Sequence, residues 1–123
     1  MESQPKLLVW NFTTEEKAGL DAFLREIGAP SAMSIDQTQG YLTVREIIDG
    51  SGPCGEGLTS AEKVILFHDV PQKGIFFLID IFQRTDLPRP IYAVVTEQSI
   101  NWPFNELLEH LVEERNRMER ESQ

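Results

Sequence analysis

Two stretches of this chain repeat one pattern, Lys6-Leu-Leu-Val-Trp-Asn-Phe12 and Lys63-Val-Ile-Leu-Phe-His-Asp-Val70. Each is a short apolar run rich in β-branched or aromatic residues, and each leads into turn or capping residues rather than into polar alternation. A continuous apolar run of this length is typical of a strand that is buried on both faces, as in a parallel sheet. The two stretches therefore predict two interior strands, one in each half of the chain.

A helix is predicted after each of these strands. In the first half, Thr13 and Glu16 have the spacing of a capping box, and apolar residues then recur at helical spacing until Gly28 ends the pattern. In the second half, Pro71 stands where a first helical turn tolerates proline, and the residues 74–84 repeat the same apolar spacing. Both halves therefore begin with a strand and a helix.

A second strand and a second helix complete each half. The strand that ends at Thr38 is matched by one that ends at Thr96 and, after an insertion of two residues, the helix that begins near Thr43 is matched by one that begins near Pro103. A strand, a helix and a following parallel strand connect right-handedly. The predicted fold class is α/β, with internally duplicated β-α-β-α units and a mainly parallel four-stranded sheet covered by helices. Pseudo-twofold and tandem arrangements of the units both remain open.

The length of 123 residues predicts a single compact domain, residues 1–123. It divides into a first repeat at 6–50, a linker at 51–62 and a second repeat at 63–118. The glycines before and within the linker fit the Gly-x-Gly-x-x-Gly spacing of dinucleotide sites, but a helix precedes them and a strand follows. That order is the reverse of the strand-to-helix context such a site needs, so no nucleotide cofactor is predicted.

The second repeat resembles a known family. The resemblance is carried by the strand 64–67, by Ala93-Val-Val-Thr96, by Asn101-Trp102 and by Glu106-Leu107-Leu108. In these residues the stretch 63–114 is similar to the bacterial domain of unknown function family 3783, a unit about half as long as this chain. Pro103 departs from the family's pattern, which has a polar residue there. The first repeat keeps Thr38 and Glu46 but has Tyr41-Leu42 in place of Asn-Trp, so it looks like a degenerate copy. The resemblance implies no activity, substrate or catalytic residue.

Composition excludes several classes of function. A formal charge of −9 repels phosphate backbones, so no nucleic acid partner is predicted. The apolar run from Ile75 to Ile79 has five residues, far fewer than the roughly 18–20 that span a bilayer, so no membrane partner is predicted. Without a signal pattern at its start, the chain is expected in the cytoplasm. One cysteine, Cys54, and two histidines, His68 and His110, make no cysteine-rich zinc site, and neither a metal nor a cofactor is expected.

Polar side chains at the predicted strand ends are candidate ligand-binding groups. His68 and Asp69 follow the third strand, Asn11 follows the first, and Thr38 and Thr96 end the other two. Open parallel sheets bind ligands at the carboxyl ends of their strands, and a histidine beside a carboxylate suits general-base chemistry. A small hydrolase or transferase is therefore one hypothesis. Turn formation and capping account for the same residues without catalysis, and no third group completes a catalytic set.

Asn101 and Trp102 stand just before the last predicted helix. An indole in this position either packs the helix onto the core or lines a ligand pocket, and the second reading gives a small-ligand sensor as a further hypothesis. The nature of such a small molecule is not specified by any residue of the pattern.

The predicted helix 74–84 has more apolar surface than one buried face requires. One stripe is made by Ile75, Leu78, Ile79 and Phe82, and it is widened to most of the circumference by Phe76, Phe77 and Ile81. The candidate interface residues are Ile75, Phe76, Phe77 and Ile79. A helix that is apolar nearly all round is buried on two sides, and in a chain this small the second side is expected to face another subunit or the other repeat. The leading prediction is a non-catalytic binding or protein-interaction module that self-associates as a homodimer or binds a protein partner through this helix.

Overall fold

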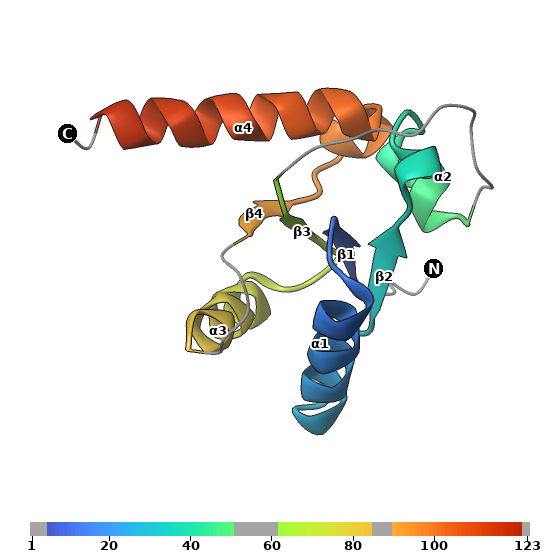
Figure 1. Ribbon diagram of the computed structural model, residues 1–123, viewed down its shortest axis with the longest axis vertical. Coiled ribbons are helices and arrows are strands. Elements are labelled where there is room, and N and C mark those ends of the chain that lie inside the picture. Colours follow the sequence, from blue (N-terminus) through green and yellow to red (C-terminus); the bar gives the residue numbers. More distant parts are fainter. Residues whose placement is uncertain (1–4, 51–61, 85–89, 122–123) are drawn as a thin grey trace.

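The computed structural model describes residues 5–50, 62–84 and 90–121 (Figure 1). The predicted linker lies almost entirely outside the described residues. Within these ranges the element order β-α-β-α occurs twice, with a short 3-10 turn before the second helix of each half, as the sequence predicts for the helices and strands. The elements are β1 Lys6–Trp10, α1 Thr14–Glu26, β2 Ala32–Ile35, η1 Gln37–Gln39, α2 Val44–Ile48, β3 Val64–His68, α3 Gln72–Gln83, β4 Ile91–Val94, η2 Ser99–Asn101 and α4 Phe104–Glu121.

The four strands form one mixed sheet in the order β2-β1-β3-β4. β1 is parallel to β2 and β3 is parallel to β4, whereas the central pair β1 and β3 is antiparallel, with Leu8 opposite Leu66. The prediction of a mainly parallel sheet is therefore wrong at the centre. Crossover helices force parallel neighbours only within a half, because a strand that returns after a helix runs in its original direction. The longer connection between the halves imposes no such direction.

Helices cover both faces of the sheet, α1 and α3 on one side and α2 and α4 on the other (Figure 1). Alternate residues of the central strands point to opposite layers, so that Leu8 and Leu66 join the α4 side while Leu7 and Phe67 join the α1 and α3 side. Because both layers are apolar, these strands carry continuous apolar runs instead of alternation. Among the described helices, none is long and apolar enough to cross a membrane.

The two halves meet a second time beyond the sheet, through reciprocal backbone hydrogen bonds. The N–H of Val44 donates to the carbonyl of Trp102 at 3.1 Å, and the N–H of Phe104 donates to the carbonyl of Leu42 at 2.8 Å. These bonds flank a single antiparallel bridge between Thr43 and Pro103. The beginnings of α2 and α4, which the sequence pattern matches to each other, therefore pair directly.

Exchange of these two amide protons should be similarly slow. Val44 and Phe104 are both fully buried and hold the same kind of bond between halves, so their exchange should be limited by the same opening. We expect protection factors within about tenfold of each other, measured by hydrogen exchange and NMR. Exchange of Val44 at the rate of an unfolded chain, with Phe104 still protected, would show that the halves do not open together.

The insertion in the second half lies before β4. Five residues separate α1 from β2, whereas seven separate α3 from β4. After the second strand of each half the chain makes the same turn, because the N–H of Asp36 donates to the Gln39 side chain at 2.9 Å and the N–H of Thr96 donates to Ser99 Oγ at 2.8 Å. Asp36 therefore has the same place in its turn as Thr96, whereas the sequence pattern matches Thr38 to Thr96.

Candidate functional site

The candidate strand-end residues lie at the two opposite ends of the strands, which form two opposite edges of the sheet. Because β1 and β3 are antiparallel, their carboxyl ends point in opposite directions. Asn11 and Thr38 therefore belong to one edge, and His68, Asp69 and Thr96 to the other. No single site contains the whole set.

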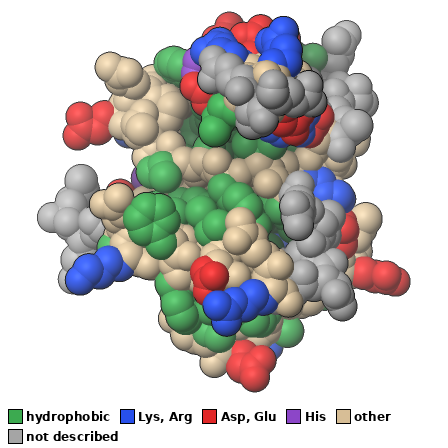
Figure 2. Space-filling model, turned by 90° about the vertical axis from the view of Figure 1, so that its left-hand side faces the viewer, with side chains coloured by type: hydrophobic (Ala, Val, Ile, Leu, Met, Phe, Trp, Pro, Cys, Tyr) green, Lys and Arg blue, Asp and Glu red, His purple; other side chains and the backbone are tan. Residues whose placement is uncertain are grey.

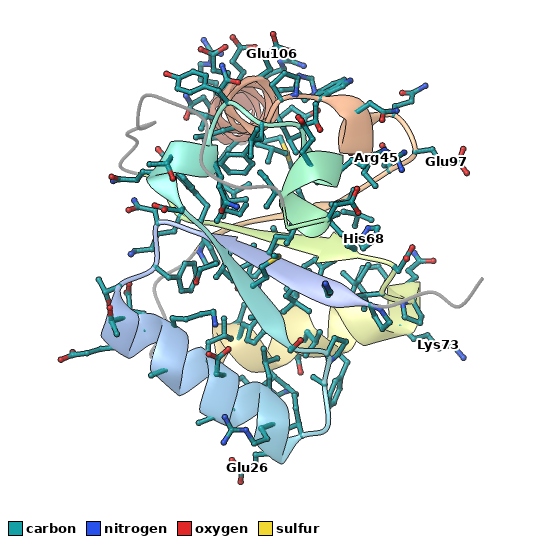
Figure 3. The ribbon with its side chains drawn as sticks, turned by 90° about the vertical axis from the view of Figure 1, so that its right-hand side faces the viewer. Glu26, Arg45, His68, Lys73, Glu97 and Glu106 are labelled. Carbon is teal, nitrogen blue, oxygen red and sulfur yellow. The ribbon has the colours of Figure 1, made fainter. Side chains whose placement is uncertain are left out.

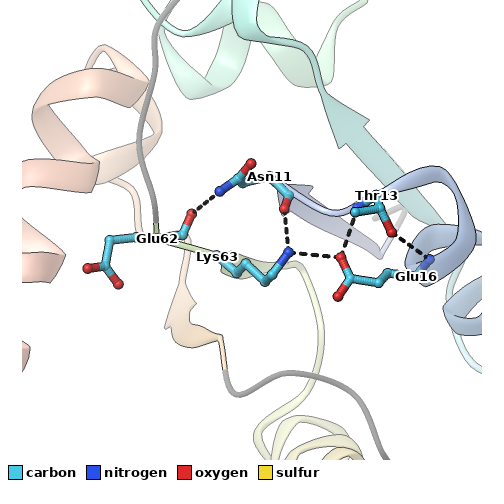
Figure 4. Close-up of polar contacts among 5 residues, drawn as sticks. All are labelled: Asn11, Thr13, Glu16, Glu62 and Lys63. Carbon is cyan, nitrogen blue, oxygen red and sulfur yellow. Dashed lines mark hydrogen bonds and ion pairs between the residues drawn. The ribbon is translucent and has the colours of Figure 1, made fainter.

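At the first edge, where β1 and β2 end, polar contacts join the two halves of the chain (Figure 4). The Lys63 ammonium donates to the carbonyl of Asn11 and to Glu16 Oε1, both at 2.8 Å, and Asn11 Nδ2 donates to the carbonyl of Glu62 at 3.1 Å. Glu16 also accepts from the N–H of Thr13 at 2.9 Å, which is the capping box that the sequence predicts. The hydrogen bond from Lys63 is the main reason that the pKa of Glu16 lies below its usual value, with the bond from Thr13 second. These contacts hold the strands and α1 together.

Thr38 and Thr96 both serve local turns. Thr38 Oγ1 donates to Asp36 Oδ2 at 3.0 Å, and Thr96 Oγ1 accepts from the N–H of Ser99 at 3.0 Å. The two residues that directly follow β1 and β3 also have a backbone role, since Asn11 and Asp69 have φ angles of 67° and 55°. Asparagine and aspartate tolerate this left-handed conformation better than most residues, which gives a backbone reason for polar residues at both strand ends.

The second edge, where β3 and β4 end, has a crevice of about 390 Å³. Figure 3 shows Arg45, His68 and Glu97 at this edge. His68 Nε2 lies 3.4 Å from Asp69 Oδ2. The segments after β3 and β4 leave toward opposite faces of the sheet, which is the arrangement in which ligand crevices form in α/β proteins. The lining residues are Arg45, His68, Asp69, Val95, Thr96, Glu97 and Ile100.

This crevice is lined by the basic side chains of Arg45 and His68 and by the acidic side chains of Asp69 and Glu97. In the part of the chain that the structure describes, no cluster of three or more histidine, cysteine, aspartate or glutamate side chains is arranged to hold a metal ion. The enzyme hypothesis for His68 and Asp69 stays a prediction.

Trp102 and Asn101 point to different neighbours. Asn101 Oδ1 accepts from Arg45 Nε at 3.2 Å. The Trp102 ring meets the His110 ring edge-on, with 5.5 Å between centroids, and His110 Nε2 lies 3.1 Å from Glu114 Oε1. Trp102 also lines a cleft of about 330 Å³ between β4 and α4. The indole thus stands beside a cavity, as the sensor hypothesis requires, and that hypothesis stays a prediction.

The four apolar residues predicted for an interface on α3 have two different environments. Ile75 is buried and Ile79 packs against the same core layer. Phe76 and Phe77 remain 62% and 55% exposed. The outward apolar surface of α3 is therefore made by the two adjacent phenylalanines.

The helix that carries these phenylalanines, α3, belongs to one side of the molecule, which we call the β4 face. It is formed by α3, the edge strand β4 and the second half of α4, and Figure 2 shows hydrophobic side chains gathered between the two helices. The exposed large apolar side chains of these three elements are Phe76 and Phe77 from α3, Val94 from β4 and Met118 from α4.

A cleft of about 650 Å³ lies between β4 and the second half of α4. In Figure 1, α4 extends past β4 on this side of the molecule. Sequence reasoning missed this cleft, although the seven-residue spacing of Phe104, Leu111 and Met118 was a usable signal for an apolar stripe along α4. The cleft is lined by Pro90, Ile91, Tyr92, Leu111, Glu114, Arg115, Met118 and Glu119.

An ion pair fixes α4 beside the cleft. The Arg115 guanidinium donates to both carboxylate oxygens of Glu62, with 2.8 Å between Nη2 and Oε1. This pairing holds the pKa of Glu62 below and the pKa of Arg115 above their usual values, chiefly through the hydrogen bonds. A bidentate arginine–carboxylate pair is geometrically specific, so the second half of α4 has a defined position relative to the start of β3.

Comparison with known proteins gives one result. A family model described as a domain of unknown function (DUF3783) matches residues 63–118, from the residue before β3 into α4. No curated protein and no solved structure matches the chain. The second half of the chain is thus similar to DUF3783, as its Thr96, Asn101-Trp102 and Glu106 pattern predicts, and the family's description assigns no activity.

Proposed function

We propose that this protein is a non-catalytic interaction module that self-associates through the β4 face. The observation that carries the proposal is the exposure of Phe76 and Phe77, at 62% and 55%, on a helix whose other large apolar side chains are buried or half-buried. Two adjacent exposed phenylalanines leave a large apolar area in water, and aromatic side chains of this kind are enriched at the centres of protein interfaces.

The charges of α3 favour a second copy as the partner. The chain as a whole has a formal charge of −9, so two copies repel each other at most orientations. Around the exposed phenylalanines, however, Lys73 and Arg84 outnumber Asp80, and Arg84 forms a 3.2 Å ion pair with Asp80. The β4 face therefore has little net charge at α3, so two copies of this face repel each other much less than two copies do at other orientations. A twofold dimer is the commonest way to bury such a face.

The proposal includes the origin and setting of the fold. We infer that the two halves derive from one duplicated β-α-β-α unit. Equal element order, the reciprocal bonds of Val44 and Phe104, and the left-handed residues Asn11 and Asp69 support the duplication. The similarity of residues 63–118 to DUF3783 is consistent with a unit of half this length. We also propose that this is an acidic bacterial protein located in the cytoplasm.

A charge-introducing double variant tests the proposed surface. Phe76→Glu with Phe77→Glu replaces two apolar contacts by carboxylates that burial in an interface would strongly disfavour. We expect the dissociation constant for self-association to rise by at least about 100-fold, since truncating one interface hot spot alone costs about 2 kcal/mol or more. Light scattering over a concentration series measures this constant, and circular dichroism checks that the fold is kept.

Ala18→Glu with Ala22→Glu is the matched control. Both alanines are exposed on α1, away from the β4 face, and the pair adds the same two negative charges. The control should keep the self-association of the unmodified chain to within a few-fold. An equal loss of association in both double variants would attribute the effect to net charge and would remove the case for the phenylalanines.

A further inference from the structure

We infer that the cleft beside β4 receives α4 of a second copy, antiparallel to its own α4, with Leu111 opposite Met118 of the partner subunit and Glu114 opposite Arg115 of the partner subunit. The inference rests on the proposed self-association and adds its partner segment and register. Three features of α4 lead to it: an apolar stripe that continues past the sheet, a cleft lined by that stripe, and the order of charges within it.

The apolar stripe of α4 extends beyond the sheet that the helix covers. Phe104 and Leu111 are buried against the core, and Met118 follows at the same seven-residue spacing, hence on the same side of the helix. Met118 is nevertheless 69% exposed, because α4 extends beyond β4 (Figure 1). The side of the helix that faces the protein core in its first turns thus faces a cleft in its last turns.

The cleft is shaped by both the sheet edge and the stripe. Pro90, Ile91 and Tyr92 form one wall, and Leu111 and Met118 lie on the other. Methionine is flexible and fits irregular apolar cavities well. A second α4 that enters this space covers Met118 and inserts its own methionine next to Leu111, so that one contact occurs twice about a twofold axis.

The charges between Leu111 and Met118 select the direction of the second helix. Glu114 and Arg115 both line the cleft and are adjacent in the chain. An antiparallel pair centred between these two residues places each carboxylate opposite a guanidinium. A parallel pair in register places glutamate against glutamate and arginine against arginine, which costs free energy. At these two positions α4 is therefore self-complementary in the antiparallel pairing and not in the parallel pairing in register.

Single cysteine variants test this register in the full chain. With Cys54, the chain's one cysteine, changed to Ser, we compare Glu114→Cys with Met118→Cys. In the inferred register the two copies of residue 114 are offset by one residue, roughly 1.5 Å along the helices, whereas the two copies of residue 118 are offset by about 10 Å. A disulfide needs Cα atoms within about 7 Å, so oxidation should cross-link Glu114→Cys at least about tenfold faster.

Glu113→Cys is the control for random collision, because residue 113 is exposed on the side of α4 away from the cleft. The inference is supported when Glu114→Cys cross-links well above both other variants. Equal or faster cross-linking of Met118→Cys overturns the register. If all three variants cross-link at the rate of Glu113→Cys while light scattering shows that the chain is a dimer, the α4 contact is overturned and the proposed function still stands. A chain that is monomeric at every concentration overturns both.

Discussion

Phe104→Ala should lower the free energy of unfolding by about 3–5 kcal/mol, the usual cost of truncating a buried phenylalanine. Phe104 is fully buried at the start of α4, and its ring lies 5.1 Å from the ring of Trp10 at the end of β1. Its N–H also closes one of the two reciprocal bonds between the halves. The cavity would therefore open where the first strand, the last helix and the two halves of the chain meet. Urea unfolding followed by circular dichroism measures the change.

Phe76→Ala is the matched control for this loss. It removes the same atoms from a side chain that is 62% exposed, so below the concentration of self-association we expect a change under about 1 kcal/mol. Equal losses in the two variants would show that Phe104 is not in the packed core. A loss under about 1 kcal/mol for Phe104→Ala would contradict the buried layer between the sheet and α4.

Stability should also fall as the pH is lowered below about 4.5, the usual pKa of a glutamate. The pKa values of Glu16 and Glu62 are lowered in the folded protein because Lys63 and Arg115 donate hydrogen bonds to them. A group with a lowered folded pKa stabilises the protein above its unfolded pKa, and this stabilisation is lost as the pH falls through the folded pKa. Since both pairs are partly open to solvent, we expect a loss of at most about 1 kcal/mol for each.

Removing the basic partners should reduce this part of the pH dependence. Lys63→Met with Arg115→Met removes the main cause of the lowered pKa of each carboxylate, although the N–H of Thr13 still lowers the pKa of Glu16. The free energy of unfolding should therefore fall less as the pH drops below about 4.5. Lys73→Met, on the exposed side of α3, should leave the change of the free energy of unfolding with pH as it is in the unmodified chain. Identical slopes for the unmodified chain and the double variant would mean that these pairs do not set the acid response.

Local signals predicted the elements of this fold well. The capping boxes of Thr13 with Glu16 and of Thr43 with Glu46 are both present, and Gly28, with φ of 69°, follows the end of α1. Such signals act within a few residues, so the sequence shows them directly. The antiparallel centre of the sheet depends on how β1 and β3 meet after a long connection, and an apolar strand looks the same beside either kind of neighbour.

The candidate surfaces were predicted in part. The excess apolar surface of α3 pointed to Phe76 and Phe77, which are exposed, but helical spacing alone did not separate them from Ile75 and Ile79, which pack inward. Met118 was overlooked because its exposure depends on where α4 passes the edge of the sheet, a property of the assembled fold. The strand-end residues were grouped by a rule for parallel sheets, and the antiparallel centre separates them.

The mass of the unmodified chain in solution is the most direct test of self-association. Light scattering over a concentration series should show a transition toward twice the chain mass of 14.0 kDa, with no larger species, because a twofold contact at the β4 face closes on itself. A mass of 14.0 kDa at every concentration would contradict the account and leave Phe76 and Phe77 exposed without a second copy to cover them.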